Sequence, residues 1–174
     1  MPQWLDKFLR KPPPFQFVER PTEKRLVLAK SCFDGLVEAL APANRRCHEG
    51  VALLLGKIED GVGVAAHAVR PDAVTTRGSF HIPASEMAKV VALATRLRFA
   101  IIAQVHTHPG EAFHSEGDQE GANIRYNGFF SLVIPEYGRF LPNLRDSTLY
   151  VFSDAHGWQL LKDAPAVVDG LTVL

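Results

Sequence analysis

The spacing of hydrophobic residues divides most of the chain into helical and extended segments. Apolar residues recur every three or four positions over Glu23–Leu40 and over Ser85–Phe99, which predicts two amphipathic helices. We expect residues 41–44, which include Pro42, to end the first helix. Ser85 is the expected N-cap of the second.

Short apolar runs predict the strands. Val51–Leu55 and Val62–Val69 lie on either side of a turn-like Glu-Asp-Gly segment, and Ala100–Val105 runs straight into His106. A polar helix is expected from about Ser115. Three more strands are predicted, at Phe129–Ile134, Ser147–Phe152 and Trp158–Leu161. Helices and strands in this order predict one α/β or α+β domain.

Residues 1–20 differ from the rest of the chain. The first thirty residues hold seven bases and three acids, and the run Pro12–Pro14 favours an extended path. We interpret residues 1–20 as an N-terminal arm and residues 21–174 as the domain. Four apolar residues of the arm have helical spacing and are expected to pack on the domain or on a partner: Trp4, Leu5, Phe8 and Leu9.

Composition and charge exclude several classes of protein. The chain has 174 residues, 47% of them hydrophobic, and equal numbers of bases and acids, which fits one globular domain without the excess of positive charge typical of a nucleic-acid binder. No apolar run reaches the roughly 18 residues of a membrane span, and the first fifteen residues lack the apolar core of a signal peptide. We therefore expect no membrane partner and a cytoplasmic location. Cys32 and Cys47 form no CxxC pair and are expected to be small buried hydrophobes.

The candidate chemistry lies in the segment HTHPGEAFHSEGD, residues 106–118. Side chains two residues apart on a strand share a face, so His106 and His108 can present two imidazoles to one point. Pro109 then turns the chain, and Ser115 begins a helix that would bring Asp118 back to the histidines. Each motif alone is common in cores and helix caps. Together they form a two-histidine, one-carboxylate set with a fourth position open, as in catalytic zinc sites.

This segment resembles the JAMM signature of JAB/MPN-domain metalloproteases: a distant Glu, then HxHP, a short loop and SxxD. Glu49, which leads into the apolar run VALLLG, matches the distant Glu. Residues 130–138, FSLVIPEYG, are similar to the strand and turn that follow the metal helix in bacterial members. The loop of residues 110–114 is one residue shorter than in eukaryotic deubiquitinases, which indicates the bacterial branch. The resemblance covers roughly residues 30–162 and implies a cytidine-deaminase-like fold, a central mixed β-sheet flanked by helices.

The resemblance also implies a role for each motif residue. His106, His108 and Asp118 would bind Zn²⁺, with the fourth position left for a water. Glu49 would act as the general base, and Ser115 would donate a hydrogen bond to the oxyanion. His48 and His114 match no ligand of the family.

The resemblance further implies a peptidase or isopeptidase that cleaves after the C-terminal glycine of a ubiquitin-like β-grasp protein. It would act in a bacterial conjugation system, such as one of antiphage defence, beside activating and conjugating enzymes. Processing of a sulfur-carrier adduct is one alternative, and a non-catalytic MPN scaffold is another. The chain lacks the H-x-E…PCxxC motif of nucleobase deaminases and the HExxH of zincins. The acids at the motif are expected to form a solvated rim or to attract a basic substrate tail: Glu111, Glu116 and Glu120.

Overall fold

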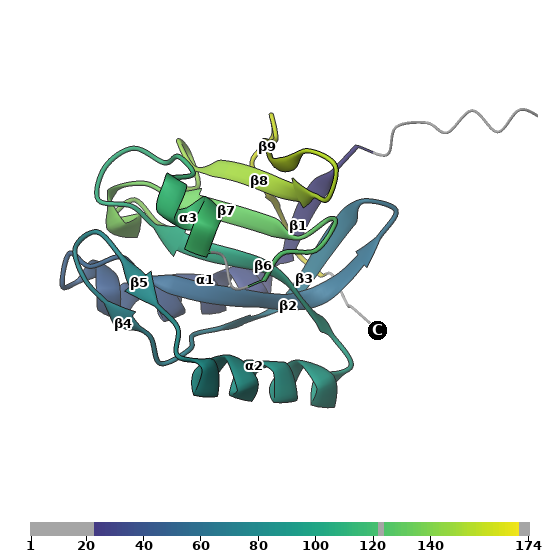
Figure 1. The fold of residues 1–174 in the computed structure, drawn as a ribbon, viewed down its shortest axis with the longest axis horizontal. Helices are drawn as coiled ribbons and strands as arrows, with labels where there is room; N and C mark the ends of the chain where they lie inside the picture. Colours follow the sequence, from purple (N-terminus) through teal and green to yellow (C-terminus); the bar gives the residue numbers. More distant parts are fainter. Residues whose placement is uncertain (1–22, 122–123, 171–174) are drawn as a thin grey trace, which may run out of the picture.

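A computed structural model describes residues 23–121 and 124–170; the predicted arm lies outside them. Eight strands form one mixed sheet in the order β10-β1-β3-β2-β6-β7-β8-β9 (Figure 1). Their bounds are β1 Arg25–Ala29, β2 Val51–Glu59, β3 Val62–Val69, β6 Ala100–Thr107, β7 Phe130–Ile134, β8 Thr148–Ser153, β9 Gly157–Leu160 and β10 Ala166–Val168. The pairs β1-β10, β1-β3 and β6-β7 are parallel and the other pairs are antiparallel. The expected mixed sheet is therefore confirmed.

Helices and a small hairpin complete the fold. The two long helices are α1, Lys30–Asn44, and α2, Ala84–Leu97. The shorter elements are the hairpin of β4, Val74–Thr75, and β5, Phe80–His81, the helix α3, Glu116–Gly121, and the 3-10 turn η2, Glu136–Gly138. In the described ranges, no helix combines the length and apolarity needed to cross a bilayer.

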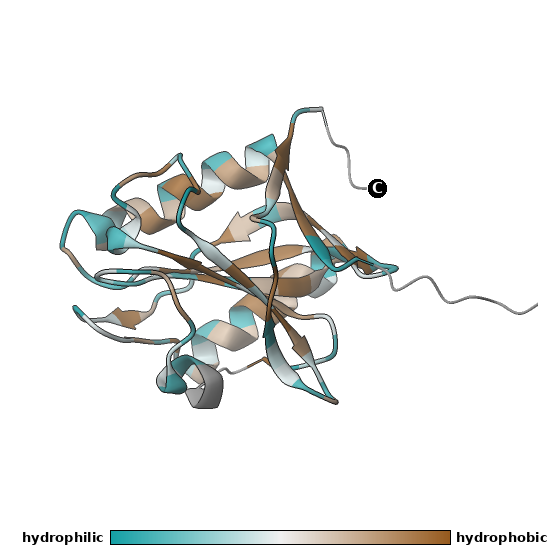
Figure 2. Cartoon of the chain, turned by 90° about the horizontal axis from the view of Figure 1, so that it is seen from above, coloured by the Kyte–Doolittle hydropathy of each residue, from teal (hydrophilic) through white to brown (hydrophobic). Residues whose placement is uncertain are grey.

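The two long helices cover opposite faces of the sheet. On one face, Leu36 and Leu40 of α1 pack into a cluster with Leu54 of β2. On the other face, α2 packs over a cluster that contains Leu53. Neighbouring residues of β2 enter different clusters because successive side chains of a strand point to opposite faces. Figure 2 shows the apolar strands running through the middle of the molecule between the two helices.

Strand β1 corrects the predicted boundaries. The helix expected over residues 23–40 begins only at Lys30, and residues 25–29 pair in parallel with both β3 and β10. A short apolar run such as RLVLA fits either a helix or a strand, and here the pairing available on both sides decides. β10 itself has three residues and was not predicted. The helix also continues through Pro42 to Asn44.

Two smaller expectations are also wrong. Pro83, and not Ser85, occupies the N-cap of α2, so Ser85 lies in the first turn of the helix. Cys32 is buried as expected, but Cys47 is exposed in the turn after α1, where its φ is 51°. Both differences arise where the chain changes direction, because the path of a turn depends on what the flanking elements pack against.

The close approach of β2 and β3 at Gly56 gives a test of the fold. A Cβ added at Gly56 would lie 1.9 Å from the Val64 carbonyl oxygen, which is backbone and cannot rotate away. We expect Gly56→Ala to lower the free energy of unfolding by about 1–3 kcal/mol, measured by denaturant titration. The matched control is Gly78→Ala, because no atom lies within 4 Å of an added Cβ there. Equal stability of the two variants would contradict this account of the β2–β3 contact.

Candidate metal centre

Strand β6 delivers the two motif histidines to one place. His106 lies near its end with a fully buried side chain, and His108 follows the strand at 5% exposure. Thr107, between them, points to the opposite face, where its hydroxyl accepts a 2.7 Å hydrogen bond from the Gly50 amide. The His108 amide donates to the Ile134 carbonyl at 2.9 Å, so the backbone remains held beyond the last strand residue. This alternation directs both imidazoles to the face of the sheet that carries the cleft described below.

Asp118 reaches the histidines from the first turn of α3. Ser115 precedes the helix, and its hydroxyl accepts a hydrogen bond from the Asp118 amide at 3.2 Å. In return, the Ser115 amide and hydroxyl donate to Asp118 Oδ2 at 2.8 and 2.6 Å. This reciprocal arrangement is a capping box with Asp at its fourth position. It caps the helix and fixes the rotamer that points the carboxylate at the histidines.

The three side chains have the geometry of a metal-binding set. His106 Nε2 lies 3.3 Å from His108 Nε2 and 3.2 Å from Asp118 Oδ1, and His108 Nε2 lies 3.2 Å from Asp118 Oδ2. Tetrahedral ligands at zinc-type bond lengths of roughly 2.0–2.1 Å stand about 3.3–3.4 Å apart. Within the described residues, this is a group of three metal-ligating side chains whose ligand atoms all lie within 4.8 Å of one another. The residues therefore fit a small divalent metal.

Burial and charge prepare these groups for a cation. Burial of the ring is the main cause that lowers the pKa of His106, which leaves the neutral imidazole that a metal requires. Burial alone would raise the pKa of Asp118. Hydrogen bonds from His106, His108 and Ser115 offset this effect and hold the pKa of the carboxyl far below its usual range. Asp118 is thus an anion between two imidazoles.

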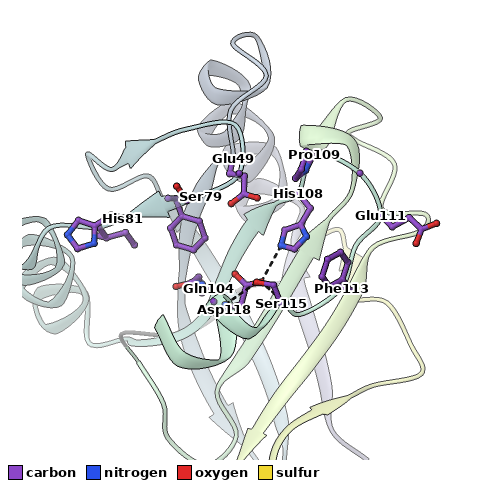
Figure 3. A pocket seen from close by; sticks show the side chains of 15 residues that line it. Glu49, Ser79, His81, Gln104, His108, Pro109, Glu111, Phe113, Ser115 and Asp118 are labelled. Atoms are coloured by element: carbon purple, nitrogen blue, oxygen red, sulfur yellow. Dashed lines mark hydrogen bonds and ion pairs between the residues drawn. The ribbon is translucent and has the colours of Figure 1, made fainter.

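Glu49 lies just before β2, at the edge of the same site. Its side chain is buried at 6% exposure, and its amide donates to the Thr76 carbonyl at 2.7 Å. Burial, with a smaller contribution from the charge of Asp118, raises the pKa of its carboxyl to about 7, against the opposing effect of His108. Figure 3 shows the side chain of Glu49 next to that of His108 in the cleft. Glu49 and His108 thus line the same cleft.

A cleft of about 630 Å³ opens onto these groups. Its walls combine the β5 hairpin, which contributes Phe80, with the loop that follows His108. Figure 3 shows Phe113 of that loop beside His108. Phe113 is 54% exposed and meets the His108 ring edge-on at 5.0 Å. Glu111 lines the cleft and is exposed, and Glu116 is exposed in the first turn of α3, whereas the side chain of Glu120 lies outside the described part of the chain.

His114 is a residue of the site that the sequence analysis left without a role. Its ring is buried, stacks on Tyr150 at 4.7 Å and meets Trp158 edge-on at 4.7 Å. His114 Nε2 lies 3.2 Å from the Ser131 hydroxyl of β7. Burial lowers the pKa of His114 to about 4, so the ring is neutral at pH 7. The ring therefore anchors the loop just before Ser115. In the sequence, the only signal of this role was the position of His114 next to the Ser of the SxxD motif.

His48 lies outside this group. Its Nδ1 is 3.3 Å from the Thr75 hydroxyl of the β4-β5 hairpin. This agrees with its exclusion from the expected ligands.

Comparison with known proteins identifies the family. The family of prokaryotic homologs of the JAB domain has a sequence model that matches residues 34–139, more than half of the chain. The chain belongs to the prokaryotic JAB-domain family. It is 30% identical over 120 residues to a probable metalloprotease, y4jG, of Sinorhizobium fredii, an alignment that spans 67% of this chain and 74% of that protein. These matches confirm the resemblance to bacterial JAB/MPN metalloproteases.

A solved structure shares the fold of this JAB-domain protein. The solution structure of protein DSY2949 from Desulfitobacterium hafniense superposes with a TM-score of 0.60. The superposition covers 85% of this chain and 94% of that one, at 16% sequence identity. At this identity the likeness supports the architecture alone, and the site rests on the geometry of the JAB-domain chain itself.

Removal of the His114 ring tests its role as a loop anchor. We expect His114→Ala to lower the free energy of unfolding by about 2–4 kcal/mol, because it leaves a cavity between two aromatic rings and an unpaired Ser131 hydroxyl. We also expect Zn²⁺ affinity to fall about 10–100-fold, because the segment that carries Ser115 and Asp118 loses its support. Thermal unfolding and competitive zinc titration measure the two effects. The control, His156→Ala, removes an exposed ring; matching zinc affinities of the two variants would exclude the anchoring role.

Proposed function

We propose that this JAB-domain protein is a zinc-dependent isopeptidase or peptidase that cleaves after the C-terminal glycine of a ubiquitin-like β-grasp protein. The observation that carries the proposal is the convergence of His106, His108 and Asp118 at a cleft that Glu49 also lines. Two imidazoles and one carboxylate are a donor set that zinc accepts in catalytic sites. His106, His108 and Asp118 would hold the ion.

Each residue of the site has a defined task in this hydrolysis. Zinc held by His106, His108 and Asp118 would act as a Lewis acid and would supply an activated water near neutral pH. Glu49 would take the proton of the attacking water and deliver it to the leaving amine, a role that suits a carboxyl whose pKa is raised by burial. Because His106 and His108 would both be occupied in holding the metal, Glu49 is left as the acid–base group of the cleft.

Ser115 would stabilise the oxyanion of the tetrahedral intermediate. Its hydroxyl lines the cleft and here donates its proton to Asp118 Oδ2. To serve the oxyanion, the O–H must turn from the carboxylate into the cleft. The Ser115 amide keeps its own bond to Asp118 during that rotation, so the carboxylate stays oriented.

The rim of the cleft supports a substrate with a basic tail. Glu111 is exposed there, and a second hollow beside it is also lined by Glu136 and Asp146. An acidic entrance favours a basic segment such as the Arg-containing end of a ubiquitin-like protein. We place this activity in a bacterial ubiquitin-like conjugation system, for example one of antiphage defence, in the cytoplasm.

Removal of the base should separate chemistry from metal binding. We expect Glu49→Gln to lower kcat at least about 10³-fold while the protein keeps its zinc, because the variant loses the proton acceptor and no ligand. His108→Ala should lose zinc and activity together. Cleavage of a β-grasp protein fused through its terminal Gly-Gly to a reporter, with zinc content by atomic absorption, provides both measurements. An active Glu49→Gln enzyme would contradict the proposed base.

Metal removal should be reversible and should destabilise the fold. A chelator is expected to abolish cleavage and to lower the Tm, because bound zinc stabilises only the folded state. Addition of stoichiometric Zn²⁺ should restore both, and Mg²⁺ should not, since it prefers oxygen ligands in octahedral geometry. A purified protein that is active without any transition metal would exclude this proposal.

Two classes of fusion distinguish the substrate. A conjugate of a ubiquitin-like protein to a lysine side chain and a sulfur-carrier protein extended beyond its C-terminal glycine both present a glycyl bond to the same site. We expect faster cleavage of the lysine conjugate. Preferred cleavage of the sulfur-carrier precursor would instead assign the protein to cofactor or cysteine biosynthesis.

A further inference from the structure

Gln104 is a polar side chain that the proposed chemistry does not use. It lies on β6, two residues before His106, and is 8% exposed. Across the described ranges, no residue forms a hydrogen bond with its carboxamide. The carboxamide is not among the fully buried polar atoms that lack a partner, so it reaches the open space of the cleft. It follows the apolar residues Ala100–Ala103 on the strand, and no contact within the described fold explains a polar side chain there.

The strand directs Gln104 into the cleft. Residues 104 and 106 share the face of β6 opposite to Val105 and Thr107, and the carboxamide lines the same cleft as Glu49 and Asp118. In the view of Figure 3, Gln104 lies on the side of Asp118 away from His108. Two strand residues span about 6.6 Å, which is about two residues of an extended peptide. Along an extended substrate, Gln104 would therefore lie opposite a peptide group one or two residues away from the metal-binding histidines.

We propose that Gln104 binds a backbone peptide group of the substrate next to the scissile bond. A carboxamide has a donor and an acceptor side by side, which match the C=O and N–H of an extended chain. It has no charge, so it does not compete with Glu49 or Asp118 for protons or metal. The proposal rests on the proposed function, and it adds a residue that positions the substrate through its backbone.

The first experiment uses stability and needs no substrate. Gln104→Met keeps an unbranched side chain of similar length and removes the unpaired polar group. Because the carboxamide forms no hydrogen bond within the described fold, a substrate-binding role predicts that the variant keeps at least the wild-type Tm. The matched control is Gln159→Met at an exposed position of β9, where we expect no change. A lower Tm for Gln104→Met would show that the carboxamide supports the fold, and would overturn the proposal.

The second experiment measures catalysis with the Gly-Gly-linked reporter fusion. We expect Gln104→Met to raise KM about tenfold, with kcat changed less than twofold and full zinc content, because a backbone contact away from the reacting atoms binds ground state and transition state alike. An unchanged KM, or a fall in kcat at constant KM, would overturn the proposal. If the wild-type protein cleaves no fusion, the proposed function fails, and the stability result still stands by itself.

A third measurement observes the side chain directly in the zinc-loaded Glu49→Gln protein. The ¹⁵N–¹H signals of the Gln104 carboxamide are assigned by their absence from the spectrum of the additional Gln104→Met variant. Titration with a peptide ending in Gly-Gly-amide should shift them, while the signals of the Gln159 control stay in place. Signals of Gln104 that do not move at saturating peptide would overturn the proposal.

Discussion

The burial of β6 on both faces is the constraint on which the rest of the structure depends. The strand lies between β2 and β7, so both of its edges are paired, and α1 packs over one of its faces. A strand held in this way cannot shift by one residue without turning every side chain to the other face. The alternation therefore sends Val105 and Thr107 to the α1 side and sends Gln104 and His106 to the cleft.

The fixed register of β6 places ionisable side chains in a buried part of the protein. Two imidazoles and a carboxylate lie within hydrogen-bond distance of one another, and Asp118 is held as an anion by its three partners. Such a cluster lowers stability unless each charge is compensated, and a divalent cation is the compensation that suits this donor set. Gln104 adds a polar group without a partner among the described residues. The large apolar clusters on both faces of the sheet tolerate this local cost, which suits a preorganised site.

Most residues of the site could be predicted from local sequence patterns. The residues that could not be predicted share one cause. HxHP after an apolar run and SxxD at a helix start are short-range signals, so the placement of His108 and of the Ser115 cap followed from the residues next to them. Strand β1 was predicted as helix because RLVLA satisfies both periodicities. His114 and Gln104 were missed because their environments are built by distant segments: Tyr150 and Trp158 surround the first, and the β5 hairpin faces the second across the cleft.

The sequence by itself determined which side chains share a face, because the strand period of two and the reciprocal capping of Ser115 and Asp118 are local geometry. It also contained the motif that assigns the chain to the JAB family. Only the tertiary structure decided that Glu49, more than fifty residues from His106 in the sequence, lies at the same cleft. The antiparallel register of β2 on β6 pairs Val51 with His106, and a pairing between distant strands depends on the packing of the whole sheet.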